Sequence, residues 1–344
     1  MTEAGSGKAS WLCKRALLAT VSLLVLSLSI GTAPAQQIID NGELVRVPGD
    51  RPNPWDLIGE LHIGETGAGT LQIENGGQVS NTIGRIGFGA TGEGAVAVTG
   101  SGSTWTNSNS LYVGEAGSGN LTIANGGSVS SSVVSQIGAL AGSSGTVTVT
   151  GSGSTWTNHG KLFVGSLGNG TITVENGGSA VVGDETVIGV AAGSSGTVTV
   201  RGAGSQLTVG SVLTVGNGGE STLTIADGGA VVGDVTLIGS GNGSSGTVTV
   251  RGAGSQLTAG TSLWVGYVGE GTLTIADGGS VISGAGNVGY GGNSDVTVSG
   301  ANSSWTNTDV LNVGMVATGH LTIENGGIVT SPITRLRPTV GKAR

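Results

Sequence analysis

Short stretches in which apolar and polar side chains alternate follow one another from about residue 61 to residue 331, and glycine-rich turns separate them. Stretches of two kinds alternate along the chain. One has the form L-x-V/I and leads into an Asn/Asp-Gly-Gly turn, and the other has the form V-x-V and leads into G-[SAN]-[GN]-S. Alternation with a period of two is typical of half-buried β-strands, and no stretch shows the period of a helix. The pattern therefore predicts an all-β protein.

The two kinds of stretch are copies of one repeating unit. The Asn/Asp-Gly-Gly turn recurs about every fifty residues, the valine-based stretch lies about halfway between two such turns, and the unit is therefore about 25 residues long and occurs about eleven times. The turns begin at Asn75, Asn125, Asn176, Asp227, Asp277 and Asn325.

A unit of this length suits one coil of a parallel β-solenoid. One coil cannot bury its own apolar face, so the coils must stack, with neighbouring strands about 4.8 Å apart. Eleven coils would give a rod of roughly 50 Å. The prediction is specific, because Ile73, Val98, Ile123 and Val149 must then lie in one line along the interior.

The two ends of the chain differ from the repeat. A basic segment ends at Lys14-Arg15, an apolar run extends from Ala16 to Ile30, and Ala33-Pro34-Ala35 offers a cleavage site, which are the features of a secretory signal peptide. The apolar run is shorter than the ~20 residues of a membrane-spanning helix. We expect a signal peptide, a cap on the first coil, the solenoid and a basic tail over residues 1–35, 36–60, 61–331 and 332–344, respectively.

Two blocks of the repeat point to a known family. They are L-x-V-G-x-x-G-x-G-x-L-T-I-x-N-G-G-x-V, from Leu111 to Val129, and G-T-V-T-V-x-G-x-G-S-x-[WL]-T, from Gly145 to Thr157. They resemble the repeat shared by autotransporter (type V secretion) passengers and PEP-CTERM proteins. The resemblance implies a right-handed parallel β-helix that is secreted or exposed at the bacterial outer membrane, and it implies no enzymatic activity. A complete autotransporter ends in an outer-membrane barrel of many amphipathic strands. Because Ser331 to Arg344 contain none, we expect the translocating barrel to be encoded elsewhere or to be missing from this chain.

Composition excludes several classes of function. Only 10% of the residues are charged, and the formal net charge is −8. Nucleic-acid binding needs clustered lysine and arginine, which the repeat does not have. The single cysteine, Cys13, lies in the predicted leader and excludes both a disulfide framework and a cysteine metal site. His62, His159 and His320 are far apart in the array, so we expect no metal site and no cofactor.

Few ionisable residues are candidates for catalysis. Arg201 and Arg251 occupy equivalent places in two identical blocks, which favours a structural role over a role in a lyase. Asp184, Glu185 and Asp234 form the best acidic group, and a glycoside hydrolase would need two carboxyl groups about 5–10 Å apart. We interpret them as a solvated acidic edge and assign no catalytic residue. The recurring Asn/Asp turn is likewise interpreted as a ladder of turn residues, with calcium binding as the alternative.

Aromatic residues fall into two sets. Trp105, Trp156 and Trp305 share their motif position with Leu207 and Leu257, which indicates a buried slot rather than a binding platform.

The second aromatic set follows from alternation. If Leu111 and Val113 point inward, Tyr112 points outward, and the equivalent residues form an outward stripe. The stripe consists of His62, Arg85, Tyr112, Gln136, Phe163, Val187, Thr214, Leu237, Trp264, Asn287 and Asn312. Exposed apolar surface often marks a contact site, so Tyr112, Phe163 and Trp264 are the candidates for contact with a ligand or partner. The alternative is that a loop covers the stripe or that the inward and outward assignments are shifted by one residue.

A second outward ladder consists of threonine on six consecutive coils. Its members are Thr146, Thr148, Thr171, Thr173, Thr197, Thr199, Thr222, Thr224, Thr247, Thr249, Thr272 and Thr274. Threonine is a good residue for an exposed strand, and flat threonine arrays also occur on ice-binding solenoids.

These observations favour an exported, surface-exposed or secreted β-helix with a structural or adhesive role, contacting a host-surface or matrix glycan or protein. A carbohydrate-active β-helix enzyme and an ice-binding solenoid are the alternatives.

Overall fold

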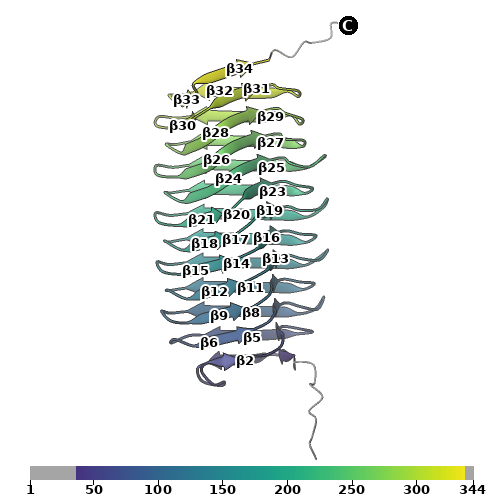
Figure 1. Ribbon diagram of the computed structural model, residues 1–344. Helices are drawn as coiled ribbons and strands as arrows, with labels where there is room; N and C mark the ends of the chain where they lie inside the picture. The colour runs from purple at the N-terminus through teal and green to yellow at the C-terminus, as the bar shows by residue number, and fades with distance from the viewer. Residues whose placement is uncertain (1–35, 338–344) are drawn as a thin grey trace, which may run out of the picture. The chain divides into compact units, whose positions relative to one another are not determined.

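The computed structural model describes residues 36–337, which form a parallel β-solenoid (Figure 1). Each turn of the solenoid, called a rung below, contributes one strand to a 12-stranded sheet and one or two strands to a 22-stranded sheet. The strands of the 12-stranded sheet are β2 (Glu43–Val47), β5 (Ala68–Ile73), β8 (Glu93–Thr99), β11 (Ser118–Ala124), β14 (Ser144–Thr150), β17 (Asn169–Glu175), β20 (Ser195–Arg201), β23 (Glu220–Ala226), β25 (Ser245–Arg251), β27 (Glu270–Ala276), β29 (Ser294–Ser299) and β32 (Gly319–Glu324).

The 22-stranded sheet holds the shorter strands that complete each rung. Its strands are β1 (Gln37–Ile39), β3 (Trp55–Asp56), β4 (Leu61–Ile63), β6 (Gln78–Asn81), β7 (Gly84–Ile86), β9 (Thr104–Asn107), β10 (Leu111–Val113), β12 (Ser128–Ser131), β13 (Val134–Ile137), β15 (Thr155–Asn158), β16 (Lys161–Val164), β18 (Ser179–Val182), β19 (Thr186–Ile188), β21 (Gln206–Val209), β22 (Val212–Val215), β24 (Ala230–Ile238), β26 (Gln256–Val265), β28 (Ser280–Val288), β30 (Ser304–Asn307), β31 (Val310–Val313), β33 (Ile328–Thr330) and β34 (Ile333–Leu336).

The predicted all-β solenoid is confirmed, and so is its interior column. Ile73 pairs with Val98, Val98 pairs with Ile123, and Ile123 pairs with Val149, all in parallel register. All four side chains are fully buried. The coil of about 25 residues therefore places each apolar side chain on its equivalent in the previous rung.

The 12-stranded sheet gives one rung more than the eleven predicted. Residues 36–60, expected to form a cap, contain β1, β2 and β3, which pair in parallel with β4, β5 and β6. Residues 333–336, expected in the basic tail, form β34 beside β31. The predicted leader and residues 338–344 lie outside the described residues. Within residues 36–337, no helix has the length and apolar character needed to cross a membrane.

The turn ladder has a conformational cause. The first residue of each Asn/Asp-Gly-Gly turn has a positive φ, 52° at Asn75 and 54° at Asp227, a region that asparagine and aspartate tolerate better than most residues. On the next rung, a serine hydroxyl accepts a hydrogen bond from the turn glycine, as Ser154 Oγ does from Gly126 N at 3.0 Å. The regular spacing of these motif residues along the chain thus places them at the corner of the solenoid.

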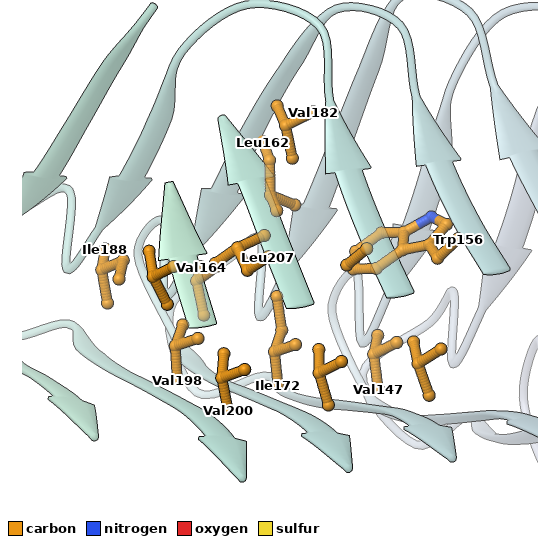
Figure 2. Packing of buried hydrophobic residues seen from close by; sticks show 14 of the residues in the cluster. Val147, Trp156, Leu162, Val164, Ile172, Val182, Ile188, Val198, Val200 and Leu207 are labelled. Carbon is orange, nitrogen blue, oxygen red and sulfur yellow. The ribbon is translucent and has the colours of Figure 1, made fainter. Parts of the chain in front are cut away.

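Large and small side chains alternate along one interior column. From the first rung to the last, its members are Trp55, Val79, Trp105, Val129, Trp156, Ala180, Leu207, Val231, Leu257, Val281, Trp305 and Val329. Figure 2 shows Trp156 and Leu207 among the buried aliphatic side chains, and the predicted slot is thus buried. A rung is only about 4.8 Å thick, so a large side chain packs best against a small one above and below it. This alternation explains why the sequence repeats every two rungs while the backbone repeats every rung.

The residue that faces the slot from the preceding rung differs between Trp105 or Trp305 and the leucines. On the rung before Trp105 and Trp305, the facing interior position is glycine, and a Cβ atom there would lie 2.6 Å from Trp105 Cζ2 at Gly84 and 2.7 Å from Trp305 Cζ2 at Gly286. Before a leucine, the same position is threonine, as at Thr236. The glycines therefore make room for the indole rings.

Candidate functional site

The outward stripe defined from the sequence is aligned in the structure. Each stripe residue is the register partner of the next, from His62 to Asn312. Tyr112, Phe163 and Trp264 are each partly exposed and lie between fully or almost fully buried neighbours, so the assignment of inward and outward faces is correct.

The stripe is not one continuous exposed surface. Val187 is 5% exposed and Thr214 is 3% exposed, and these two residues separate Phe163 from the aromatic residues farther along the chain. Neighbouring groups therefore cover the middle of the stripe, between Phe163 and Trp264. Three separate regions remain.

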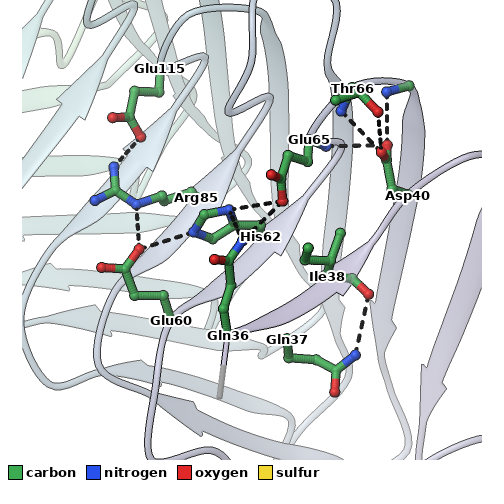
Figure 3. Close-up of polar contacts among 11 residues, drawn as sticks. Gln36, Gln37, Ile38, Asp40, Glu60, His62, Glu65, Thr66, Arg85 and Glu115 are labelled. Atoms are coloured by element: carbon green, nitrogen blue, oxygen red, sulfur yellow. Dashed lines mark hydrogen bonds and ion pairs between the residues drawn. The ribbon is translucent and has the colours of Figure 1, made fainter. Parts of the chain in front are cut away.

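The first region is a network of charged side chains at the N-terminal end of the stripe (Figure 3). Arg85 Nε donates to Glu60 Oε2 at 2.8 Å, and the Arg85 guanidinium also contacts the Glu115 carboxylate. The buried ring of His62 lies between Glu60 Oε2, at 3.0 Å, and Glu65 Oε2, at 3.3 Å. These residues come from three successive rungs and tie the rungs together.

The charges in this network reinforce one another. Burial raises the pKa of Glu60, but hydrogen bonds from Arg85 and His62 outweigh it and bring the pKa below its ordinary value. Burial lowers the pKa of Arg85, and the two carboxylates it contacts raise it further than burial lowers it. Arg85 also lies over Tyr112, with 4.9 Å between its Cζ atom and the ring centroid. Tyr112 is thus held against a cation, which fixes its ring in place.

The second region surrounds Phe163. The turns that follow β13 and β16 carry Leu140 and Leu167, which are 47% and 49% exposed. Three apolar side chains thus lie at or near the surface over two neighbouring rungs.

The third region is an aromatic cluster of Trp264, Tyr267 and Tyr290. The Trp264 ring is 5.4 Å from that of Tyr267 and 5.1 Å from that of Tyr290, with interplanar angles of 81° and 80°. The two tyrosine rings are stacked at 5.5 Å and 11°. Trp264 Nε1 donates to Ser262 Oγ at 3.0 Å, which holds the indole back along its own strand.

Tyr267 and Tyr290 are not among the candidates predicted from the sequence. Both are the second residue after a buried valine, in Val265-Gly266-Tyr267 and Val288-Gly289-Tyr290. This shared position in the turn after the strand would have identified them as neighbours on successive rungs.

The threonine ladder is aligned as predicted. The two columns run in register over β14, β17, β20, β23, β25 and β27, and every one of the twelve threonines is half-buried between two buried residues. One column extends beyond the predicted range, to Thr122 at one end and Thr322 at the other.

The acidic candidates take part in contacts between neighbouring rungs. Asp184 Oδ1 accepts a hydrogen bond from Ser211 Oγ at 3.0 Å, and Asp234 Oδ1 accepts one from Thr261 Oγ1. Glu185 forms an ion pair of 3.0 Å with Lys161.

The arginine candidates lie elsewhere, at the end of strands in the 12-stranded sheet, where Arg201 contacts Glu175 at 2.8 Å through its Nε atom. Within residues 36–337, no three His, Cys, Asp or Glu side chains are grouped as a metal site would require.

Comparison with known proteins connects the repeat to exported proteins. No family model matches the chain. Over 153 residues, 43% of this chain, it is 40% identical to the "Uncharacterized lipoprotein YdeK" of Escherichia coli (strain K12). Over 164 residues, 47% of this chain, it is 41% identical to the "Adhesin BmaC autotransporter" of Brucella suis biovar 1 (strain 1330). These alignments span only 11% and 4% of the two relatives.

A solved structure, of the TibC-catalysed hyper-glycosylated TibA55-350 fragment, matches with a TM-score of 0.47 and 20% identity over 88% of this chain and 96% of that fragment. The 164-residue alignment with the autotransporter adhesin, which covers 47% of this chain, confirms the resemblance of the repeat to that of autotransporter passengers.

Proposed function

We propose that this chain is the β-solenoid of an exported adhesive protein of the autotransporter-passenger type, secreted or displayed at the bacterial cell surface, and that it acts by contact rather than by catalysis. The repeat shared with an autotransporter adhesin over 164 residues carries the proposal. The chain spans a small part of the relatives it matches, and adhesion is proposed by analogy with one of them, an autotransporter adhesin.

The outward stripe supplies the contact surface in this proposal. Tyr112, Phe163 and Trp264 present aromatic rings on the face of a rigid scaffold, and aromatic residues are enriched where proteins contact partners. The partner is a glycan or protein of a host surface or matrix. An outer-membrane barrel is the proposed translocator.

The absence of a catalytic role is supported by how the carboxylates are used. Asp184 and Asp234 each bond a hydroxyl group of the next rung, and Glu185 pairs with Lys161. A hydrolase needs one carboxyl group to protonate a leaving group while the other attacks or activates water. Carboxylates that already bond groups of a neighbouring rung are poorly placed to act as the acid and the base of a hydrolase.

Two measurements test the proposal. The full chain, expressed with its leader in its native bacterium, which supplies the translocator, is expected in the medium or at the surface, where external protease removes it, and its mature N-terminus is expected near Gln36. Beads coated with the mature chain are expected to bind host cells or matrix-coated wells.

Ala substitution of Tyr112, Phe163 and Trp264 together should abolish that binding. Ala substitution of Thr148, Thr199 and Thr249, on the 12-stranded sheet, is the matched control and should leave it unchanged. A chain that stays in the cytoplasm, or beads that bind no surface, would refute the proposal.

A further inference from the structure

We infer that the aromatic cluster of Trp264, Tyr267 and Tyr290 is a binding site for an uncharged saccharide. The inference rests on the proposed function and names the ligand class of one part of the contact surface. Of the three candidate aromatic residues on the stripe, Trp264 alone is joined by two further aromatic rings.

The geometry of the rings forms a corner. The hydrogen bond from Trp264 Nε1 to Ser262 Oγ directs the indole back over strand β26. The stacked rings of Tyr267 and Tyr290 lie beside it at nearly a right angle to its plane. The indole ring and the tyrosine rings thus present two aromatic surfaces at nearly a right angle. Such surfaces suit a ligand that has an apolar face and polar edges, and a sugar ring has both, an apolar C–H face and hydroxyl groups at its edge.

The polar groups of the corner are neutral. Each tyrosine contributes a hydroxyl that can donate and accept a hydrogen bond, as sugar hydroxyls also do. The next two stripe positions are Asn287 and Asn312, which bond each other at 2.9 Å. Arg335 follows on the third rung, about 14 Å away along the axis, and is the first basic residue on this column beyond Trp264.

This neutrality decides the ligand class. Carboxylate, sulfate and phosphate groups are recognised by lysine and arginine, and the cluster itself contains neither. The corner also differs from the N-terminal end of the stripe, where Glu60 and Glu115 contact Arg85 and Glu65 contacts His62. An uncharged saccharide fits the aromatic corner, and an acidic polysaccharide does not.

The aromatic cluster is accessible to a ligand from solvent. Tyr290 is 38% exposed and Val268, in the turn between the strands, is 41% exposed. Trp264 is partly exposed, whereas Trp55, Trp105, Trp156 and Trp305 are at most 7% exposed. Trp264 is therefore the tryptophan, within residues 36–337, that a soluble ligand can reach.

The difference in exposure between Trp264 and the other described tryptophans provides the assay. The mature full-length chain is titrated with cellohexaose, maltohexaose, mannohexaose and chitohexaose, and with hexagalacturonate as the acidic arm, while quenching of tryptophan fluorescence by acrylamide is followed. A neutral hexasaccharide is expected to protect Trp264 from the quencher. Trp264→Phe should remove the protectable signal, which assigns the signal to this residue.

Two variants locate the contact. Tyr290→Ala should weaken the affinity for that hexasaccharide about tenfold or more, because it removes one aromatic wall of the corner. Leu167→Ala removes another exposed apolar side chain, outside the cluster, and should leave the affinity unchanged. Both positions are exposed turn residues, so neither variant is expected to unfold the protein.

The outcomes separate this inference from the proposed function. Protection by no neutral hexasaccharide, protection by hexagalacturonate alone, or full affinity in Tyr290→Ala would each overturn the saccharide site. If beads still bind host surfaces in any of those cases, the proposed adhesive function stands. If protection is seen but no surface is bound, the adhesive function fails and the saccharide site stands.

Discussion

Exchanging the contents of one interior slot tests the packing on which the whole solenoid depends. The tryptophan set near the C-terminal end is Gly286, Trp305 and Asn307, and the leucine set two rungs earlier is Thr236, Leu257 and Ala259. We predict that each single substitution toward the leucine set destabilises the protein and that the complete exchange restores most of the loss.

The size of each effect follows from the contacts. A Cβ atom at Gly286 would lie 2.7 Å from Trp305 Cζ2 and would also overlap the Asn307 amide, so Gly286→Thr overpacks the interior at a cost of about 3 kcal/mol. Trp305→Leu with Asn307→Ala leaves a cavity and removes the hydrogen bond from Ser283 Oγ to Asn307 Oδ1 of 2.9 Å, for about 3 kcal/mol. If the sites were independent, the triple variant would lose about 6 kcal/mol. We expect about 2–3 kcal/mol, since the threonine fills the space that the indole vacates.

The assay is the free energy of unfolding from urea titrations followed by far-UV circular dichroism, because removing Trp305 alters the fluorescence. Hydrogen exchange of the amides in β28, β30 and β31 gives the same differences locally. Gly260→Thr is the matched control, because the nearest atom to a Cβ at Gly260 lies 3.4 Å away. That variant should change stability by no more than about 0.5 kcal/mol. A triple variant as unstable as the sum of its parts would refute the size-complementarity argument.

Three further predictions concern other parts of the array. Deleting residues 209–258 removes two rungs and keeps the order of large and small side chains, whereas deleting residues 220–244 removes one rung and stacks leucine on leucine. The variant with the smaller deletion should therefore unfold at the lower temperature. Equal midpoints of thermal unfolding would contradict the two-rung unit. Thr236→Val should be neutral or should stabilise by about 1 kcal/mol in urea unfolding, because the Thr236 hydroxyl is buried without a hydrogen-bond partner, and a loss of stability would show that it has one. Burial raises the pKa of Asp40, but hydrogen bonds from Thr66 and neighbouring backbone amides outweigh it and lower the pKa from 3.8 to about 2. The carboxylate therefore stabilises the fold above about pH 4 and loses that contribution as the pH falls through 2. Asp40→Asn should flatten the dependence of the urea midpoint on pH in this window.

The fold could be predicted from the sequence because one signal repeats about eleven times. The alternation that buries Leu111 and Val113 also turns Tyr112 outward, so the interior columns and the outward stripe follow from the same two-residue period. The additional first rung was missed because residues 48–54 replace the usual glycine turn with a longer segment that contains Pro48 and Pro54.

Features that depend on contacts between rungs were harder to predict. Arg85 bonds Glu60 and Glu115, which lie 25 and 30 positions away in the sequence, and no local motif predicts such a network. Exposure along the stripe depends on the turn beside each strand, so the burial of Val187 and Thr214 could not be predicted from the strand pattern alone. Tyr267 and Tyr290 lie in those turns, which the motif comparison treated as spacers.

The two-rung period of the interior also sets the spacing of the outer surface. Tyr112, Phe163 and Trp264 all lie on rungs whose interior slot holds the larger side chain, so these three aromatic residues are separated by multiples of two rungs, about 10 Å for each two rungs. Phe163 and Trp264 are four rungs, or about 19 Å, apart, with covered residues between them. The deletion of residues 209–258 halves this distance without altering either patch. A saccharide held by the aromatic corner alone should bind that variant as well as it binds the full chain, whereas a longer partner that spans both patches should not.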